Sequence, residues 1–247
     1  MAALVDEQEE LRMNGNRRTA VVAGVLYITG TVAGVSSVVV MGGRLDAPDY
    51  LTVFANDANP VRWAALLVLV MGLALAMVPA VLFPILKRQN AALAVGYVIF
   101  RGALETALYI AGAICWLLLI VVAREHGGSP ASADSPLSSL GTLLIEAGDP
   151  IAAVRDIVFS LGALMLSSLL YKARLIPRWL SGWGIIGAVA YLAAGLLGVF
   201  NTELVVLLVP LGLQEIVMAV WLIAKGFNAS AIAALTPPHL TETPVRS

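Results

Sequence analysis

The sequence predicts an all-α polytopic membrane protein, a bundle of six transmembrane helices. Hydrophobic residues make up 60% of its 247 residues and charged residues only 13%, whereas a soluble domain carries about 25% charged residues. The runs 19–43, 63–86 and 179–202 contain no charged residue, and each exceeds the roughly 20 apolar residues that cross a bilayer. The net charge of -1 gives no sign of the basic surface that binds nucleic acid.

The apolar runs and the breaks between them give the spans in order. We expect spans at about 19–41, 63–86, 91–123, 151–171, 180–200 and 204–224, each helical because lipid offers no partner to an unpaired backbone amide. The first run is too long for the core of a signal peptide and no small-residue cleavage pattern follows it, so we expect it to be retained. The transmembrane domain should cover residues 18–227, with polar tails at 1–17 and 228–247.

The connection before the fourth span carries two helix signals. Asp149 and Pro150 suit an N-cap and a first helical residue, so the fourth helix should begin near Ile151. The preceding segment LGTLLIEA suggests a short amphipathic helix. Within the spans, Gly30 with Gly34 and Gly184 with Ala188 have the spacing that lets helices approach closely. This spacing fits packing inside one bundle, and a homo-oligomer is the alternative.

The positive charges predict the orientation. With the N-terminus in the cytoplasm, the inner side holds ten of the 15 Lys and Arg residues and the outer side three, which places both termini inside. The inner set is Arg12, Arg17, Arg18, Lys87, Arg88, Lys172, Arg174, Arg178, Lys225 and Arg246, and the outer set is Arg44, Arg62 and Arg124.

Five charged residues interrupt the predicted spans: Arg101, Glu105, Arg155, Asp156 and Glu215. A rise of about 1.5 Å per residue puts Arg101 about 15 Å and Glu215 about 17 Å from the nearer helix end, close to the bilayer midplane. A charge there costs roughly 2.5–3.5 kcal/mol and normally faces a partner inside the bundle. We therefore expect Arg101 to meet Glu105, one turn later, and Glu215, if the third and sixth helices are neighbours.

Several hypotheses about the role of these charged residues are open. Gln214 and Tyr109 are candidates for further hydrogen bonds in the centre. Arg155 and Asp156 are adjacent, so they are poorly placed to share one helix face. We expect them to form a polar pair at the outer rim. In an alternative register, residues 106–123 form the third span, and Arg101 and Glu105 extend to the inner interface. The centre either binds or passes a small or lipid-like ligand, or it only fixes helix packing. In the ligand hypothesis Arg101 is an anion anchor, and Glu105 and Glu215 balance its charge or take up a proton.

Known catalytic and metal-binding patterns are missing from the sequence. The two histidines, His126 and His239, lie outside the spans, and Cys115 is the only cysteine. Neither an intramembrane haem nor a zinc protease helix fits this pattern, so we expect no cofactor, no metal and no catalytic residue. An intramembrane enzyme that uses only carboxylates and arginine is a more distant hypothesis. The partners expected are membrane lipids.

Four segments carry a family resemblance: RRTAVVAGVLYITGTVAGV near the start, LFPILKRQNAALAVGYVIFRGALE at 82–105, LLYKARLIPRWLSGWGIIGA at 169–188 and EIVMAVWLIAKGF at 215–227. Together they resemble a family of bacterial multi-pass membrane proteins known only as a domain of unknown function, numbered 4386. The resemblance covers about residues 17–228. It implies a helical bundle in the cell (inner) membrane, and it implies no activity or ligand.

Overall fold

The computed structural model describes residues 2–127, 136–202 and 204–235. These residues form helices and turns, and no strand occurs among them. The helices are α1 (Ala2–Met41), α2 (Tyr50–Asn56), α3 (Asn59–Gln89), α4 (Ala91–Tyr97), α5 (Glu105–Gly127), α6 (Pro136–Glu146), α7 (Gly148–Ala173), α8 (Arg178–Gly198), α9 (Val209–Ala224) and α10 (Ala229–Ala234). Two 3₁₀ helices, η1 (Gly42–Asp46) and η3 (Val205–Leu207), and one π-helix, η2 (Val98–Leu104), complete them.

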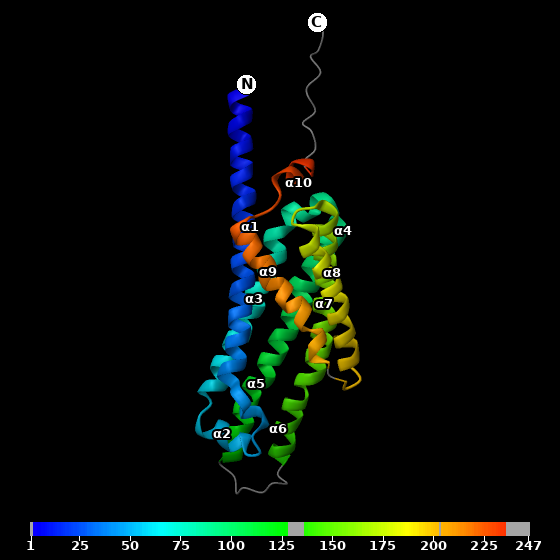
Figure 1. The fold of residues 1–247 in the computed structure, drawn as a ribbon. Helices are drawn as coiled ribbons and strands as arrows, with labels where there is room; N and C mark the ends of the chain where they lie inside the picture. The colour runs from blue at the N-terminus through cyan, green and yellow to red at the C-terminus, as the bar shows by residue number, and fades with distance from the viewer. Residues whose placement is uncertain (1, 128–135, 203, 236–247) are drawn as a thin grey trace.

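Long helical segments run roughly along one axis of an elongated bundle (Figure 1). The described residues contain six segments that are long and apolar enough to cross a membrane: Asn14–Asp46, Asn59–Gln89, Ala91–His126, Pro136–Ala173, Arg178–Gly198 and Val205–Ala224. The predicted six-helix membrane fold is therefore confirmed. In the bundle, α1 packs on α3 and α9, α3 packs on α5, and α7 packs on α8, which in turn contacts α9.

Several helix boundaries differ from the prediction. Helix α7 begins at Gly148, with Ala147 at the N-cap position and no side-chain cap, so the predicted cap at Asp149 does not form. Pro150 is accommodated because the amides of the first helical turn need no intrahelical partner. Helix α9 begins only at Val209, after the 3₁₀ turn at 205–207. The segments expected as polar tails also carry helix, because α1 begins at Ala2 and α10 follows Asn228, whose side chain accepts a hydrogen bond from the Ser230 amide.

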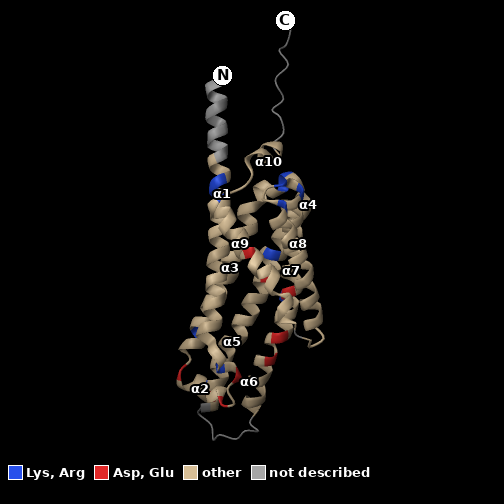
Figure 2. Ribbon diagram, viewed as in Figure 1, with Lys and Arg blue, Asp and Glu red and all other residues tan. Residues whose placement is uncertain are grey.

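One end of the bundle gathers basic residues, and we call it the basic end. Figure 2 shows Lys and Arg concentrated there, at the end that carries α4 and α10. Arg17 of α1 donates to the carbonyl oxygens of Leu222 (3.0 Å) and Ile223 (2.7 Å) at the last turn of α9. A cation at a helix C-terminus is favourable because unpaired carbonyls concentrate negative charge there. Of the ten cations predicted inside, the side chain of Arg12 and all of Arg246 lie outside the described residues.

Small residues bring α1 and α8 close to their neighbours. A Cβ atom built on Gly30 would lie 2.6 Å from Leu75, and one on Gly34 would lie 2.5 Å from the Met71 sulfur, so this face of α1 is occupied by α3. Gly184 of α8 faces Ser167 and Gln214 in the same way. Both predicted small-residue faces are therefore used inside the bundle.

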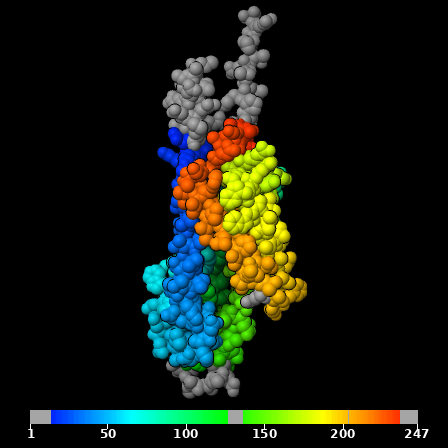
Figure 3. Space-filling model, viewed as in Figure 1, coloured from blue at the N-terminus to red at the C-terminus, as the bar shows by residue number. Residues whose placement is uncertain are grey.

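The bundle is less complete at the end opposite the basic end, which we call the far end. Helix α8 ends at Gly198, whose Cβ position lies 3.2 Å from Ala153, in the second turn of α7. Helix α8 therefore ends near the level at which α7 begins, and α6 extends past it without a neighbour from α8. Figure 3 shows a recess beyond the start of α9, between α1 and α6, with α5 visible on its floor. A Cβ atom on Gly112 of α5 would meet nothing within 4 Å, as expected for a residue beside open space.

Candidate functional site: a buried arginine–glutamate centre

The π-helix η2 holds the arginine of the candidate site. It covers Val98–Leu104 between α4 and α5, and Arg101 is its middle residue. Short π segments inside α-helices are rare and occur frequently at functional sites. On the facing helix α7, a Cβ atom on Gly162 would lie 3.4 Å from the Arg101 backbone nitrogen. The glycine therefore lets η2 approach α7 closely, which seats Arg101 in the interior.

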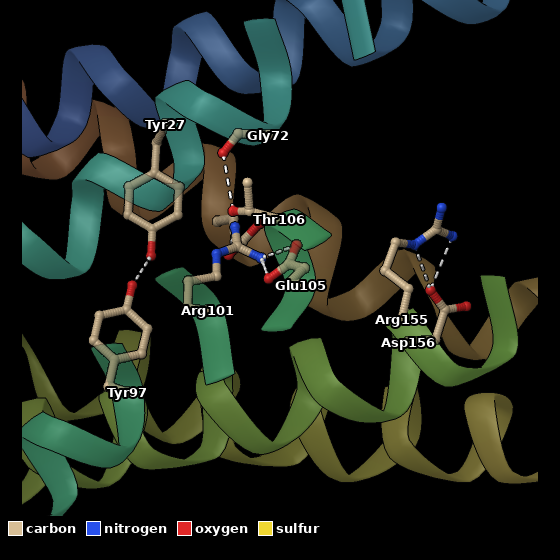
Figure 4. A network of polar contacts seen from close by, with 9 residues as sticks. Tyr27, Gly72, Tyr97, Arg101, Glu105, Thr106, Arg155 and Asp156 are labelled. Carbon is tan, nitrogen blue, oxygen red and sulfur yellow. Dashed lines mark hydrogen bonds and ion pairs between the residues drawn. The ribbon is translucent and has the colours of Figure 1, made fainter. Parts of the chain in front are cut away.

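Arg101 pairs with two carboxylates from two helices. Its Nη1 atom lies 2.9 Å from both carboxylate oxygens of Glu105, at the start of α5. Its Nη2 atom lies 3.0 Å from Oε1 of Glu215 on α9. The side chains of Arg101 and Glu105 are 2% and 1% exposed, whereas Glu215 is 16% exposed. We call these three residues the Arg–Glu centre; Figure 4 shows Arg101 and Glu105 from close by.

This geometry distinguishes between the two registers considered from the sequence. Side chains that extend to an interface would be at least partly exposed, but Arg101 and Glu105 are both enclosed by protein. The predicted contact between Arg101 and Glu215 is present. The third and sixth spans therefore meet at this level through a charged pair.

Aromatic rings complete the surroundings of Arg101. The Arg101 Cζ atom lies 4.4 Å from the Phe159 ring centroid and 5.8 Å from that of Tyr27, a range in which a cation is attracted to the ring face. Tyr27 and Tyr97 are both buried, and their hydroxyls lie 3.0 Å apart (Figure 4). The buried Nε atom of Arg101 has no hydrogen-bond partner among the described residues.

The sequence reasoning missed this tyrosine pair. Tyr97 precedes Arg101 by one helical turn, and Tyr27 interrupts the apolar run of the first span. Both positions carried a signal, because a hydroxyl in the middle of an apolar helix needs a partner. Nothing in the two local segments indicated that the two helices would meet.

A second charged pair lies about one helix turn before Phe159 on α7. Arg155 Nη2 and Nε lie 3.0 and 3.2 Å from the same carboxylate oxygen, Asp156 Oδ1. Adjacent residues share a helix face poorly, and these two side chains meet because the long arginine side chain bends back toward its neighbour (Figure 4). The Arg155 Cζ atom also lies 5.4 Å from the Tyr109 ring centroid. Tyr109 follows Glu105 by one turn, so it lies between the two charged pairs.

Gln214 faces a different neighbour. Its Nε2 atom donates to the Leu180 carbonyl oxygen of α8 at 3.2 Å and lies 3.8 Å from the Met218 sulfur. The side chain therefore joins α9 to α8, and these bonds do not connect it to Arg101. Adjacent residues on a helix point in directions about 100° apart, which explains how Glu215 faces Arg101 while Gln214 faces α8.

The charges of the centre do not balance. One guanidinium faces two carboxyl groups, so the three groups carry one negative charge in excess when all are ionised. Glycines border open space on both helices that carry the acids. Gly112, two turns after Glu105, and Gly212, one turn before Glu215, have no atom within 4 Å of their Cβ positions. Among the described residues, no group of three or more His, Cys, Asp or Glu is arranged to hold a metal ion.

Comparisons with known proteins give one match. A search of curated proteins and a search of solved structures return no match. The family model described as "Domain of unknown function (DUF4386)" matches residues 22–226, which include all three members of the Arg–Glu centre. The chain belongs to this DUF4386 family of proteins.

Proposed function

We propose that this integral membrane protein binds or passes a small or lipid-like ligand at the Arg–Glu centre, and that it resides in the cell membrane. The observation that carries the proposal is the uneven pairing of one buried arginine with two glutamates. Charged groups at membrane depth are costly, and they normally mark a ligand site or an ion path. If the centre only fixed helix packing, one arginine paired with one glutamate would be enough.

The chemistry of the centre favours a ligand that brings a positive charge or N–H donors. Arg101 is already engaged by both acids, so its role is to position them. Glu215 has the most accessible side chain of the three, and open space borders Gly212 one turn away. We propose that a protonated amine contacts Glu215 and offsets the excess negative charge. The role of anion anchor for Arg101 would require one acid to release it.

The access route in this proposal is the recess at the far end. It lies between α1 and α6, where the short hairpin of α8 and α9 leaves α5 uncovered (Figure 3). An amphiphile with an apolar chain would keep that chain against the exposed apolar residues around the recess while its head group reaches Glu215. Both helices beside the recess carry exposed apolar side chains, among them Ile114 and Leu118 of α5 and Val38 of α1.

A purely structural role is the alternative, and the direct pairing supports it. All the bonds of the centre are 2.9–3.0 Å long and need no ligand. Buried ion pairs sometimes only fix the arrangement of helices. The carboxylate in excess over the single arginine favours the ligand hypothesis instead.

Three amphiphiles with one chain length and different head groups separate these hypotheses. Dodecylamine, dodecanol and dodecanoate are added to the purified full chain in neutral detergent, and the thermal unfolding midpoint is measured. We expect dodecylamine to raise the midpoint and dodecanol to leave it unchanged. Replacing Glu215 with glutamine should abolish the increase because it removes the charge that the amine contacts. The control is Glu146→Gln, at an exposed position of α6.

Each contrary outcome has a distinct meaning. Stabilisation by dodecanoate instead of dodecylamine would restore Arg101 as the anchor and overturn the amine assignment. An equal response of the wild type and Glu215→Gln would show that the amphiphile binds elsewhere. No response to any of the three would favour the structural role.

A further inference from the structure

A separate pocket opens at the basic end, remote from the Arg–Glu centre. Its volume is about 480 Å³, within the range of about 300–1,000 Å³ that small-molecule sites occupy. The pocket is formed where α7 ends, α8 begins and α9 ends. Its lining residues are Arg174, Leu175, Ile176, Pro177, Arg178, Trp221, Lys225, Gly226, Phe227 and Asn228.

Three cations meet in this pocket from three places in the chain. Arg174 follows α7, Arg178 is the first residue of α8, and Lys225 follows α9. No carboxylate of the described residues lies within 4.0 Å of their charged atoms, since the ion pairs found there involve other side chains. The pocket therefore concentrates positive charge without an internal counter-ion.

The backbone and side chains around the pocket are packed and hydrogen-bonded. The Asn228 amide donates to the Leu175 carbonyl oxygen at 2.9 Å, which ties the segment after α9 to the loop between α7 and α8. Leu175 and Ile176 are buried, and the rings of Trp221 and Trp179 pack edge to face at 6.4 Å. Arg174 is held with a φ of 53°, in the left-handed region that favours glycine. The backbone that carries the three cations is therefore held by hydrogen bonds and packing.

We propose that this pocket binds the phosphate of an anionic ligand, and that the ligand is an anionic phospholipid. Basic pockets between helix ends at a membrane surface bind lipid head groups. The pocket lies where the apolar stretches of α8 and α9 begin and end, and exposed apolar side chains continue from it along both helices, at Trp179, Ile186 and Val220. A phosphate held by the cations would leave acyl chains free to follow this surface. Inorganic phosphate carries the same phosphate chemistry, but it has no acyl chains that could contact that apolar surface.

Native mass spectrometry of the full chain in neutral detergent tests the proposal. Short-chain phosphatidylglycerol, phosphatidylcholine and inorganic phosphate are titrated separately. We expect phosphatidylglycerol to bind, and the double variant Arg178→Gln/Lys225→Gln to bind it about 25-fold more weakly, from about fivefold for each cation near a membrane surface. The matched control is Lys87→Gln/Arg88→Gln, which removes two cations at the end of α3, outside the pocket lining.

The outcomes separate the sources of phosphate. Inorganic phosphate that binds as tightly as phosphatidylglycerol would keep the phosphate site and overturn the lipid assignment. Equal weakening by the two double variants would mean that general surface charge attracts the lipid, and would overturn the site. Equal binding of phosphatidylcholine and phosphatidylglycerol would do the same. Folding is monitored by the thermal unfolding midpoint, and if the double variant is unfolded, the single variant Lys225→Gln is used with a fivefold expectation.

Discussion

At the scale of single residues, the Arg–Glu centre predicts a non-additive response to mutation. Arg101→Met leaves Glu105 and Glu215 buried without their cation. Removing one partner of a buried pair costs about 3–5 kcal/mol, so the free energy of unfolding should fall by about that amount. The triple variant Arg101→Met/Glu105→Leu/Glu215→Leu should recover most of the loss, because no charge stays buried. Reversible unfolding in mixed micelles measures both values.

The ligand and structural hypotheses differ in what else the triple variant changes. Under both, stability returns, but under the ligand hypothesis the dodecylamine response is lost. A triple variant as unstable as Arg101→Met would show that the glutamates contribute through contacts other than the ion pairs.

The Tyr27–Tyr97 pair gives a second prediction at this scale. Each hydroxyl is buried and has the other as its partner, with 3.0 Å between the oxygens. Either single change to phenylalanine leaves one buried hydroxyl unpaired, which costs about 1–3 kcal/mol. The double change removes both groups and should be less destabilising than the two single changes added together. A double-mutant cycle from unfolding measurements tests this, with the exposed Tyr171→Phe as the control.

At the scale of helices, close packing at Gly24 predicts which glycines tolerate a side chain. A Cβ atom on Gly24 would lie 2.7 Å from the Ala219 carbonyl oxygen of α9, a backbone atom that cannot rotate away. Gly24→Ala should therefore separate α1 from α9 and lower the unfolding midpoint. Gly112→Ala is the matched control, because open space surrounds that position and alanine in a helix interior is favoured over glycine by about 0.5–1 kcal/mol. Equal destabilisation of both variants would contradict this account.

The sequence predicts most of the helices and misses their irregularities for identifiable reasons. Long uncharged runs define the spans because lipid selects apolar residues at every exposed position. The π-helix at 98–104 leaves no such trace, since a shift of a few hydrogen bonds needs no change in composition. The late start of α9 is hidden because LVVLL at 204–208 is as apolar as the helix itself. Pro150 and Asp149 misled the prediction because a helix start also depends on the preceding α6.

At the scale of the whole molecule, charge cost was the one long-range signal in the sequence. Hydropathy does not say which helices are neighbours, because lipid-facing and protein-facing residues are both apolar. The need to pair Glu215 led to the predicted contact between the third and sixth spans, which is present. Gln214 carried a weaker constraint, because an amide can bond a carbonyl oxygen on any neighbouring helix, and it bonds Leu180 instead. The recess at the far end follows from the relative lengths of all six segments, and no single segment encodes it.

The distribution of charge over the two ends predicts the orientation of the molecule. Six crossing segments place the start of α1 and the end of α9 on the same side, as Figure 1 shows. Among the described residues, Lys and Arg gather at that end (Figure 2). It holds Arg17 in the first part of α1, Lys87 at the end of α3 and Arg178 at the start of α8, whereas Arg44, Arg62 and Arg124 belong to segments at the other end. Cytoplasmic segments of membrane proteins are enriched in Lys and Arg, so we expect both termini inside.

Fusions to reporter proteins measure this orientation directly. Green fluorescent protein joined to either terminus should fluoresce, because it folds in the cytoplasm, and alkaline phosphatase inserted after Gly127 should be active, because it folds outside. A control fusion of alkaline phosphatase after Gln89, at the end of α3, should be inactive. The reverse pattern would place the basic pocket on the outer face and the recess toward the inner leaflet. In that case, the lipid that reaches each site would have to come from the opposite leaflet, because both sites are fixed in the same rigid bundle.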